Sequence, residues 1–122
     1  MKKLLLLATL LFFFTACGLA SVYNVKPTKI ENPKSMEATY KAIKEAGQSL
    51  GWKIRKQQEG VAKGTLHLRS HVAVVRINYS ASDYSITYVK SQNLKYDPET
   101  KEIHKNYNSW IKNLENAIDI NL

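Results

Sequence analysis

Three histidines and one serine are the side chains whose types and spacing could support catalysis or hold a metal. His67 and His71 stand four residues apart, and His104 lies far along the chain. We expect His67 on the outward face of a strand and His71 beyond a turn, so nothing forces their rings together, and no carboxylate is placed to orient them. Ser70 directly precedes His71, but neighbouring residues of an extended chain point to opposite faces. The sequence therefore predicts no metal, no cofactor and no nucleophilic catalytic site.

Basic side chains alternate with apolar ones in the middle of the chain. Between Trp52 and Arg76 the only acidic residue is Glu59. Because alternate residues of a strand share a face, this pattern predicts a basic outward sheet face with an apolar centre at Val72, Val74 and Val89. Its cationic members are Lys53, Arg55, Lys63, His67, Arg69 and Arg76. A surface of one charge sign can bind anions or an acidic partner, but solvation alone also explains charges on an open face.

Four strand patterns and two helix patterns position these side chains. Alternation of apolar and polar residues predicts strands over residues 52–56, 61–69, 71–79 and 84–90, joined as antiparallel hairpins. An amphipathic helix begins after the N-cap Ser35 and ends at Gly51, and Gly47 in its apolar stripe leaves room for a sheet to cross closely. The fold class predicted for residues 35–122 is therefore a single small α+β domain. It is a two-layer sandwich in the order αββββα, with a four-stranded antiparallel meander and both helices on one face.

The second helix is expected to begin between His104 and Asn106 and to carry Trp110 at the centre of its apolar stripe. The start of this helix is dense in asparagine, tyrosine and histidine. We interpret these residues as structural: the asparagines cap the helix and close the preceding loop, and the aromatic rings of Tyr107 and Trp110 fill the core.

The first sixteen residues have the pattern of an export signal. Two lysines precede an apolar run over residues 4–14 and a pair of small residues. This run is too short to span a bilayer, which needs roughly 20 apolar residues. Cys17 follows directly and is the one cysteine of the chain. The segment resembles the lipobox of bacterial lipoproteins, which implies that Cys17 is acylated and becomes the first residue of the mature protein.

This interpretation predicts a lipoprotein signal peptide over residues 1–16 and an acylated tether over 17–34. An unpaired thiol in an oxidising compartment needs a reason, and acylation supplies one. The acyl chains make the lipid bilayer the first expected partner. Gly18 stands where aspartate would retain a Gram-negative lipoprotein at the inner membrane, so the resemblance implies the outer membrane, facing the periplasm.

The C-terminal half resembles a group of small bacterial lipoproteins that have no assigned function. The resemblance begins near Leu66 and includes the last-helix motif His104-x-Asn106-Tyr107-Asn108-x-Trp110. It covers more than half of the mature chain. It implies the same fold and the same place in the cell envelope, and it supplies no catalytic residue.

Together these features predict a non-enzymatic accessory protein, anchored to the bacterial envelope, that binds an anionic lipid, lipopolysaccharide or an envelope protein. The full chain carries a net charge of +8, which falls to +6 without the two lysines of the signal. Nucleic acid would fit this charge but not the compartment. One alternative is a structural module that docks onto a larger envelope assembly by its sheet edge or open face. A hydrolase that uses His67 or His104 is the third possibility.

Overall fold

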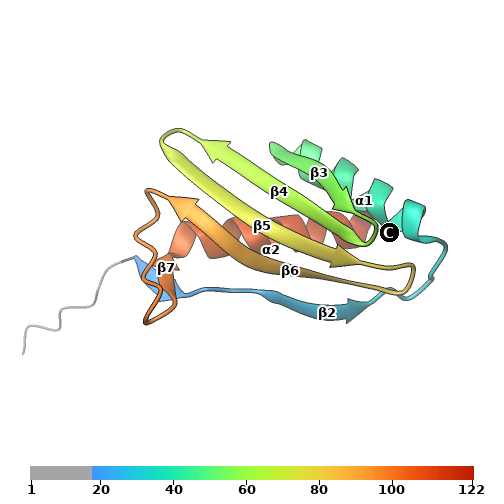
Figure 1. The fold of residues 1–122 in the computed structure, drawn as a ribbon, viewed down its shortest axis with the longest axis horizontal. Coiled ribbons are helices and arrows are strands. Elements are labelled where there is room, and N and C mark those ends of the chain that lie inside the picture. The colour runs from blue at the N-terminus through green and yellow to red at the C-terminus, as the bar shows by residue number, and fades with distance from the viewer. Residues whose placement is uncertain (1–17) are drawn as a thin grey trace, which may run out of the picture.

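The computed structural model describes residues 18–122, which form two helices and two antiparallel sheets (Figure 1). The strands are β1 (Leu19–Ser21), β2 (Val25–Lys29), β3 (Trp52–Gln58), β4 (Val61–Leu68), β5 (His71–Tyr79), β6 (Asp83–Gln92) and β7 (Glu102–His104). The helices are α1 (Met36–Ser49) and α2 (Lys105–Asn121). Neither of these two helices is long and apolar enough to cross a membrane.

The main sheet has five strands in the order β2-β6-β5-β4-β3, and β1 pairs with β7 in a second, two-stranded sheet. The α+β class is as predicted, but the predicted four-stranded meander lacked β2. Its sequence, Val25 to Lys29, contains Pro27 and little alternation, a pattern that predicts a tether and not a strand. Proline is tolerated here because β2 is an edge strand, where a missing backbone donor leaves no ladder bond unmade. A bulge between Val25 and Thr28 adjusts its register on β6.

Within the tether predicted for residues 17–34, two segments are the strands β1 and β2. The backbone is already held at Gly18, whose carbonyl accepts a hydrogen bond of 2.7 Å from the Lys105 amide. The Asn108 side chain then accepts a hydrogen bond from the Tyr23 amide at 2.9 Å and donates one to the Ser21 carbonyl at 2.8 Å. Asn108 thus binds the N-terminal segment as a neighbouring strand would. Cys17 and the signal peptide predicted for residues 1–16 lie outside the described residues.

Both helices cover the same face of the main sheet, as predicted, and lie behind it in Figure 1. Helix α1 begins at Ser35, whose hydroxyl oxygen accepts from the Ala38 amide at 3.0 Å. The prediction for Gly47 is confirmed as well, because β3 crosses α1 at this residue. A Cβ atom added to Gly47 would lie 2.5 Å from Cγ1 of Ile54. The missing side chain is what allows this close approach.

The hydrophobic core lies between the helices and the sheet. Its fully buried side chains come from α1, the central strands and α2 and include Ile43, Val75, Ile77, Tyr84, Ile86, Tyr107, Ile111, Leu114 and Ile118. Trp110 was expected at the centre of the α2 stripe, but it is only partly buried. It lies at the border of the stripe, where its ring centroid is 6.1 Å from that of His71.

Candidate functional site

Three cations line up across three adjacent strands on the face of the sheet opposite the helices. Arg55 of β3 lies directly opposite Lys63 of β4, and Lys63 lies directly opposite Arg76 of β5. Neighbouring strands are about 4.8 Å apart, so the backbone positions of these residues fall within about 10 Å. The structure therefore brings together half of the predicted basic residues in what we call the cation row: Arg55, Lys63 and Arg76.

The cation row has no ionic partner within the fold. Like charges directly opposite each other on neighbouring strands destabilise a sheet. In residues 18–122 the one ion pair joins Lys41 and Glu45 on α1, at 3.9 Å, far from this face. Arg55 and Arg76 are exposed and Lys63 is half-buried. An anion placed over the row would relieve the mutual repulsion of its charges.

A second row of residues runs beside the first. It contains Lys53 of β3, Thr65 of β4, Val74 of β5 and Lys90 of β6. Between Val74 and Val75 the register shifts by one residue, which leaves Val89 as the extra residue of a bulge in β6. A bulge redirects the side chains that follow it. It therefore brings Lys90 to the outward face, although strict alternation from Val89 would turn Lys90 toward the helices. The alternation of residues in the sequence therefore did not predict Lys90 as part of the basic face.

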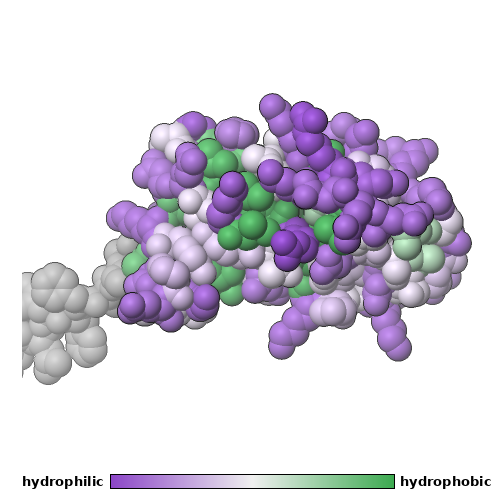
Figure 2. All heavy atoms as spheres, viewed as in Figure 1, coloured by the Kyte–Doolittle hydropathy of each residue, from purple (hydrophilic) through white to green (hydrophobic). Residues whose placement is uncertain are grey.

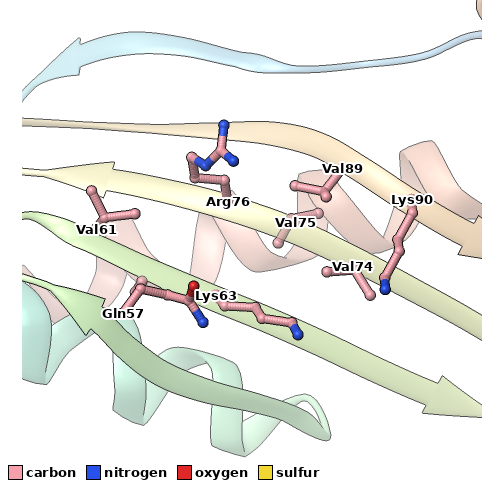
Figure 3. Close-up of a pocket in the computed structure, with 9 residues that line it drawn as sticks. Gln57, Val61, Lys63, Val74, Val75, Arg76, Val89 and Lys90 are labelled. Atoms are coloured by element: carbon pink, nitrogen blue, oxygen red, sulfur yellow. The ribbon is translucent and has the colours of Figure 1, made fainter.

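A hollow of about 220 Å³ on this face is lined by Lys63 and Arg76 of the first row and by Val74 and Lys90 of the second. Its floor is apolar and its rim is cationic: the lining includes Val61, Val74, Val75 and Val89 together with Lys63, Arg76 and Lys90. Figure 3 shows Lys63 and Lys90 on either side of Val74. Figure 2, in the same view as Figure 1, shows a hydrophobic patch on this face surrounded by hydrophilic side chains. We call this feature the valine hollow.

Comparison with protein-family models, with curated proteins and with solved structures finds no match. The chemistry of the site is therefore inferred from its own side chains. Guanidinium and ammonium groups donate charge-assisted hydrogen bonds to phosphate, sulfate and carboxylate oxygens. The arrangement of the cation row suits the binding of an anion.

The other three predicted basic residues lie outside the cation row. Lys53 belongs to the second row, and His67 is exposed opposite Val72, farther along the same face. Arg69 is not on the face, which corrects the prediction. The pattern extended the strand to residue 69, but Leu68 and His71 form the last pair of β4 and β5. Arg69 is therefore in the two-residue turn, with a φ of 56° that is typical of such hairpins.

The histidines and Ser70 have separate structural partners. His71 Nδ1 lies 2.6 Å from the carbonyl oxygen of Asn93, whose side-chain amide donates to Ser70 Oγ at 2.6 Å. His104 is the N-cap of α2 and accepts from the Asn106 amide at 3.2 Å, so the cap is this histidine and not one of the asparagines that the sequence predicted. Within residues 18–122 no three His, Cys, Asp or Glu side chains cluster in a way that could hold a metal ion.

Proposed function

We propose that this chain is a lipid-anchored protein of the bacterial cell envelope, held to the outer membrane by acylated Cys17 and facing the periplasm. It is a non-enzymatic accessory protein that binds an anionic envelope component through its basic sheet face. The observation that carries the proposal is the cation row, in which Arg55, Lys63 and Arg76 stand side by side without an acidic partner in the described fold.

A binding role explains why three cations stand opposite one another despite their mutual repulsion, which solubility alone does not require. Scattered surface charges keep a protein soluble, whereas three cations opposite one another repel each other. The row lies on β3, β4 and β5, which are held by continuous pairing over most of their length. Because the sheet is rigid, the three side chains start from fixed positions, and little conformational freedom of the backbone is lost on binding.

The proposed anchor places the domain close to anionic headgroups. Strand β1 begins at Leu19, two residues after Cys17. Two extended residues span at most about 7 Å, so an acylated Cys17 would hold the domain at the bilayer surface. Anionic lipids attract Lys and Arg near the surface by about 1 kcal/mol per residue.

Reversal of the cation row tests this proposal. We expect Arg55→Glu, Lys63→Glu and Arg76→Glu, combined in residues 18–122, to weaken binding to phosphatidylglycerol-containing vesicles by about 100-fold or more, because about 3 kcal/mol of attraction is lost. Binding of the unmodified domain should also weaken with salt, which screens exposed charges beyond about 8 Å at physiological ionic strength. Vesicle co-sedimentation gives both measurements.

A matched control carries the same charge change on the helix side of the molecule and at the loop before α1. Lys34→Glu, Lys44→Glu and Lys112→Glu are exposed positions outside the basic face. This control should bind vesicles more tightly than the row reversal. If the two triple variants bind equally well, only net charge matters and the proposed site is wrong. If the unmodified domain binds no anionic vesicle, the docking module becomes the better candidate, because β3 is an open edge of the sheet.

A further inference from the structure

We infer that the ligand of the basic face is a single anionic amphiphile of the membrane, a lipid with a phosphate headgroup and an alkyl chain. This inference rests on the proposed function and adds the chemical class of the ligand. The cation row would hold the phosphate, and the valine hollow would take part of the alkyl chain.

The apolar floor is the first reason for this assignment. A surface that binds only ions needs donors and charge, but this one also has valines in its middle. Val74 points away from the core and is nevertheless only 4% exposed, because its neighbours on the outward face cover it. Val89 is 42% exposed and is the extra residue of the bulge in β6. Burying such a side chain against an alkyl group is favourable, whereas a hydrated ion gains nothing from it.

The spacing of apolar and charged groups is the second reason. Arg76 is two residues from Val74 on the same strand and face, a separation of about 6.7 Å along β5. Lys63 and Lys90 also line the hollow (Figure 3). A short alkyl segment against the exposed Val89, which lies in the bulge opposite Val74 and Val75, would therefore leave the headgroup attached to it within reach of two or three cations.

The position of the hollow favours a membrane lipid over a free metabolite. Val89 and Lys90 line one end of the hollow and belong to the last four residues of β6, which ends at Gln92, whereas Val61, the first residue of β4, lines its other end. Figure 1 shows this end of β6 at the same end of the molecule as β1 and β7, where the chain leads toward Cys17. The hollow holds about 220 Å³ and is open to solvent, so it suits a segment of a chain that remains partly in the bilayer.

Three soluble probes separate charge from apolar contact. Residues 18–122 contain the whole described core and serve as the titrated protein, with calorimetry or fluorescence as the measurement. Octyl phosphate, below its micelle concentration, carries both parts of the ligand, inorganic phosphate only the charge, and octyl glucoside only the chain. We expect octyl phosphate to bind at least about tenfold more tightly than either of the others. From butyl to octyl phosphate, each added methylene that reaches the hollow should lower Kd by up to about fourfold.

Two variants assign the two parts of the site. Val89→Gln changes an exposed residue, and it should bring octyl phosphate close to the affinity of inorganic phosphate. Lys63→Gln combined with Arg76→Gln should bring it close to the affinity of octyl glucoside. Ile120→Gln on α2, at a residue 84% exposed, and Lys44→Gln on α1 are the matched controls and should change nothing. Thermal unfolding of each variant verifies that it is folded.

The outcomes distinguish this inference from the proposed function. If inorganic phosphate binds as tightly as octyl phosphate, or Val89→Gln has no effect, the site takes ions alone and the amphiphile is wrong, although vesicle binding can still depend on the cation row. If octyl glucoside binds as tightly, the hollow is merely apolar and the inference is again wrong. If no probe binds while vesicle binding depends on the row, the surface recognises a charged bilayer and holds no single lipid.

Discussion

Two buried tyrosines of the core differ in how their hydroxyl groups are satisfied. Tyr84 is 1% exposed and donates a hydrogen bond of 2.6 Å to Oδ1 of Asp119. Burial, together with this bond to the carboxylate, raises the pKa of Tyr84 far above its ordinary value. Burial also raises the pKa of Tyr107, whose hydroxyl is fully buried and has no hydrogen-bond partner within residues 18–122. Both hydroxyls are therefore neutral in the folded protein. Only the Tyr84 hydroxyl has a hydrogen bond that replaces those it loses to water on burial.

These tyrosines give a matched pair of substitutions. Tyr107→Phe removes a buried hydroxyl that lacks a partner, so we expect the free energy of unfolding to rise by about 1 kcal/mol. Tyr84→Phe removes a bonded hydroxyl and leaves the Asp119 carboxylate without its donor, so we expect a fall of about 1 kcal/mol. Urea unfolding at neutral pH measures both. A loss of stability in Tyr107→Phe would contradict this account and would indicate that the hydroxyl has a partner.

At the scale of elements, α2 is the support for the N-terminal segment. At the start of this helix the Lys105 amide donates a hydrogen bond to the Gly18 carbonyl. The Asn108 side chain accepts from the Tyr23 amide and donates to the Ser21 carbonyl. Farther along the helix, Glu115 accepts a hydrogen bond of 2.9 Å from the Tyr23 hydroxyl. Three successive parts of one helix thus hold a segment that is more than 80 residues away in sequence.

Removal of the Asn108 side chain should release this segment without unfolding the domain. We expect Asn108→Ala to cost about 2 kcal/mol, about 1 for each lost hydrogen bond, and Asn108→Asp to cost less because it keeps the acceptor. Hydrogen exchange should accelerate over residues 18–24 and stay unchanged in the β4–β5 hairpin. Equal protection of residues 18–24 in the alanine variant would show that the β1–β7 pairing holds the segment by itself.

At the scale of the whole molecule, the described chain begins at one end of the long axis, beside β7 (Figure 1). The basic face runs along this axis on the side opposite the helices. An anchor at this end, with at most about 7 Å between Cys17 and β1, would restrict how far the face can move from the bilayer. The proposed lipid site and the proposed anchor would then act on the same membrane.

Replacement of Cys17 by serine tests the anchor. The variant should lose its lipid and either leave the membrane fraction or remain uncleaved, because no second cysteine is present in the chain. Fractionation and mass spectrometry of the mature protein provide the measurement. Detection of the same processing and acylation as in the unmodified protein would rule out the lipoprotein interpretation. The row reversal is the control, since it should leave acylation intact.

The sequence by itself determined the helices, the central hairpins and the side of the sheet on which most residues of these hairpins lie. These features depend on local periodicity, because a strand repeats every two residues and a helix every 3.6. This is why the shared outward face of Arg55, Lys63 and Arg76 and the close packing at Gly47 could be predicted from residue patterns. The direct cross-strand pairing of the three cations was decided by the register of the strands. The Cys17 anchor is likewise an interpretation of a local pattern, and it stays a prediction.

Only the tertiary structure decided the features that depend on residues far apart in the chain. Strand β2 forms because it pairs with the edge of β6, and the segment around Ser21 is held in place by hydrogen bonds with Asn108. The bulge at Val89 turns Lys90 outward and so completes the valine hollow. None of these features has a periodic signature. Each depends on a partner that is distant in the sequence. The local residue pattern does not identify such a partner, because pairing between distant segments depends on the packing of the entire chain.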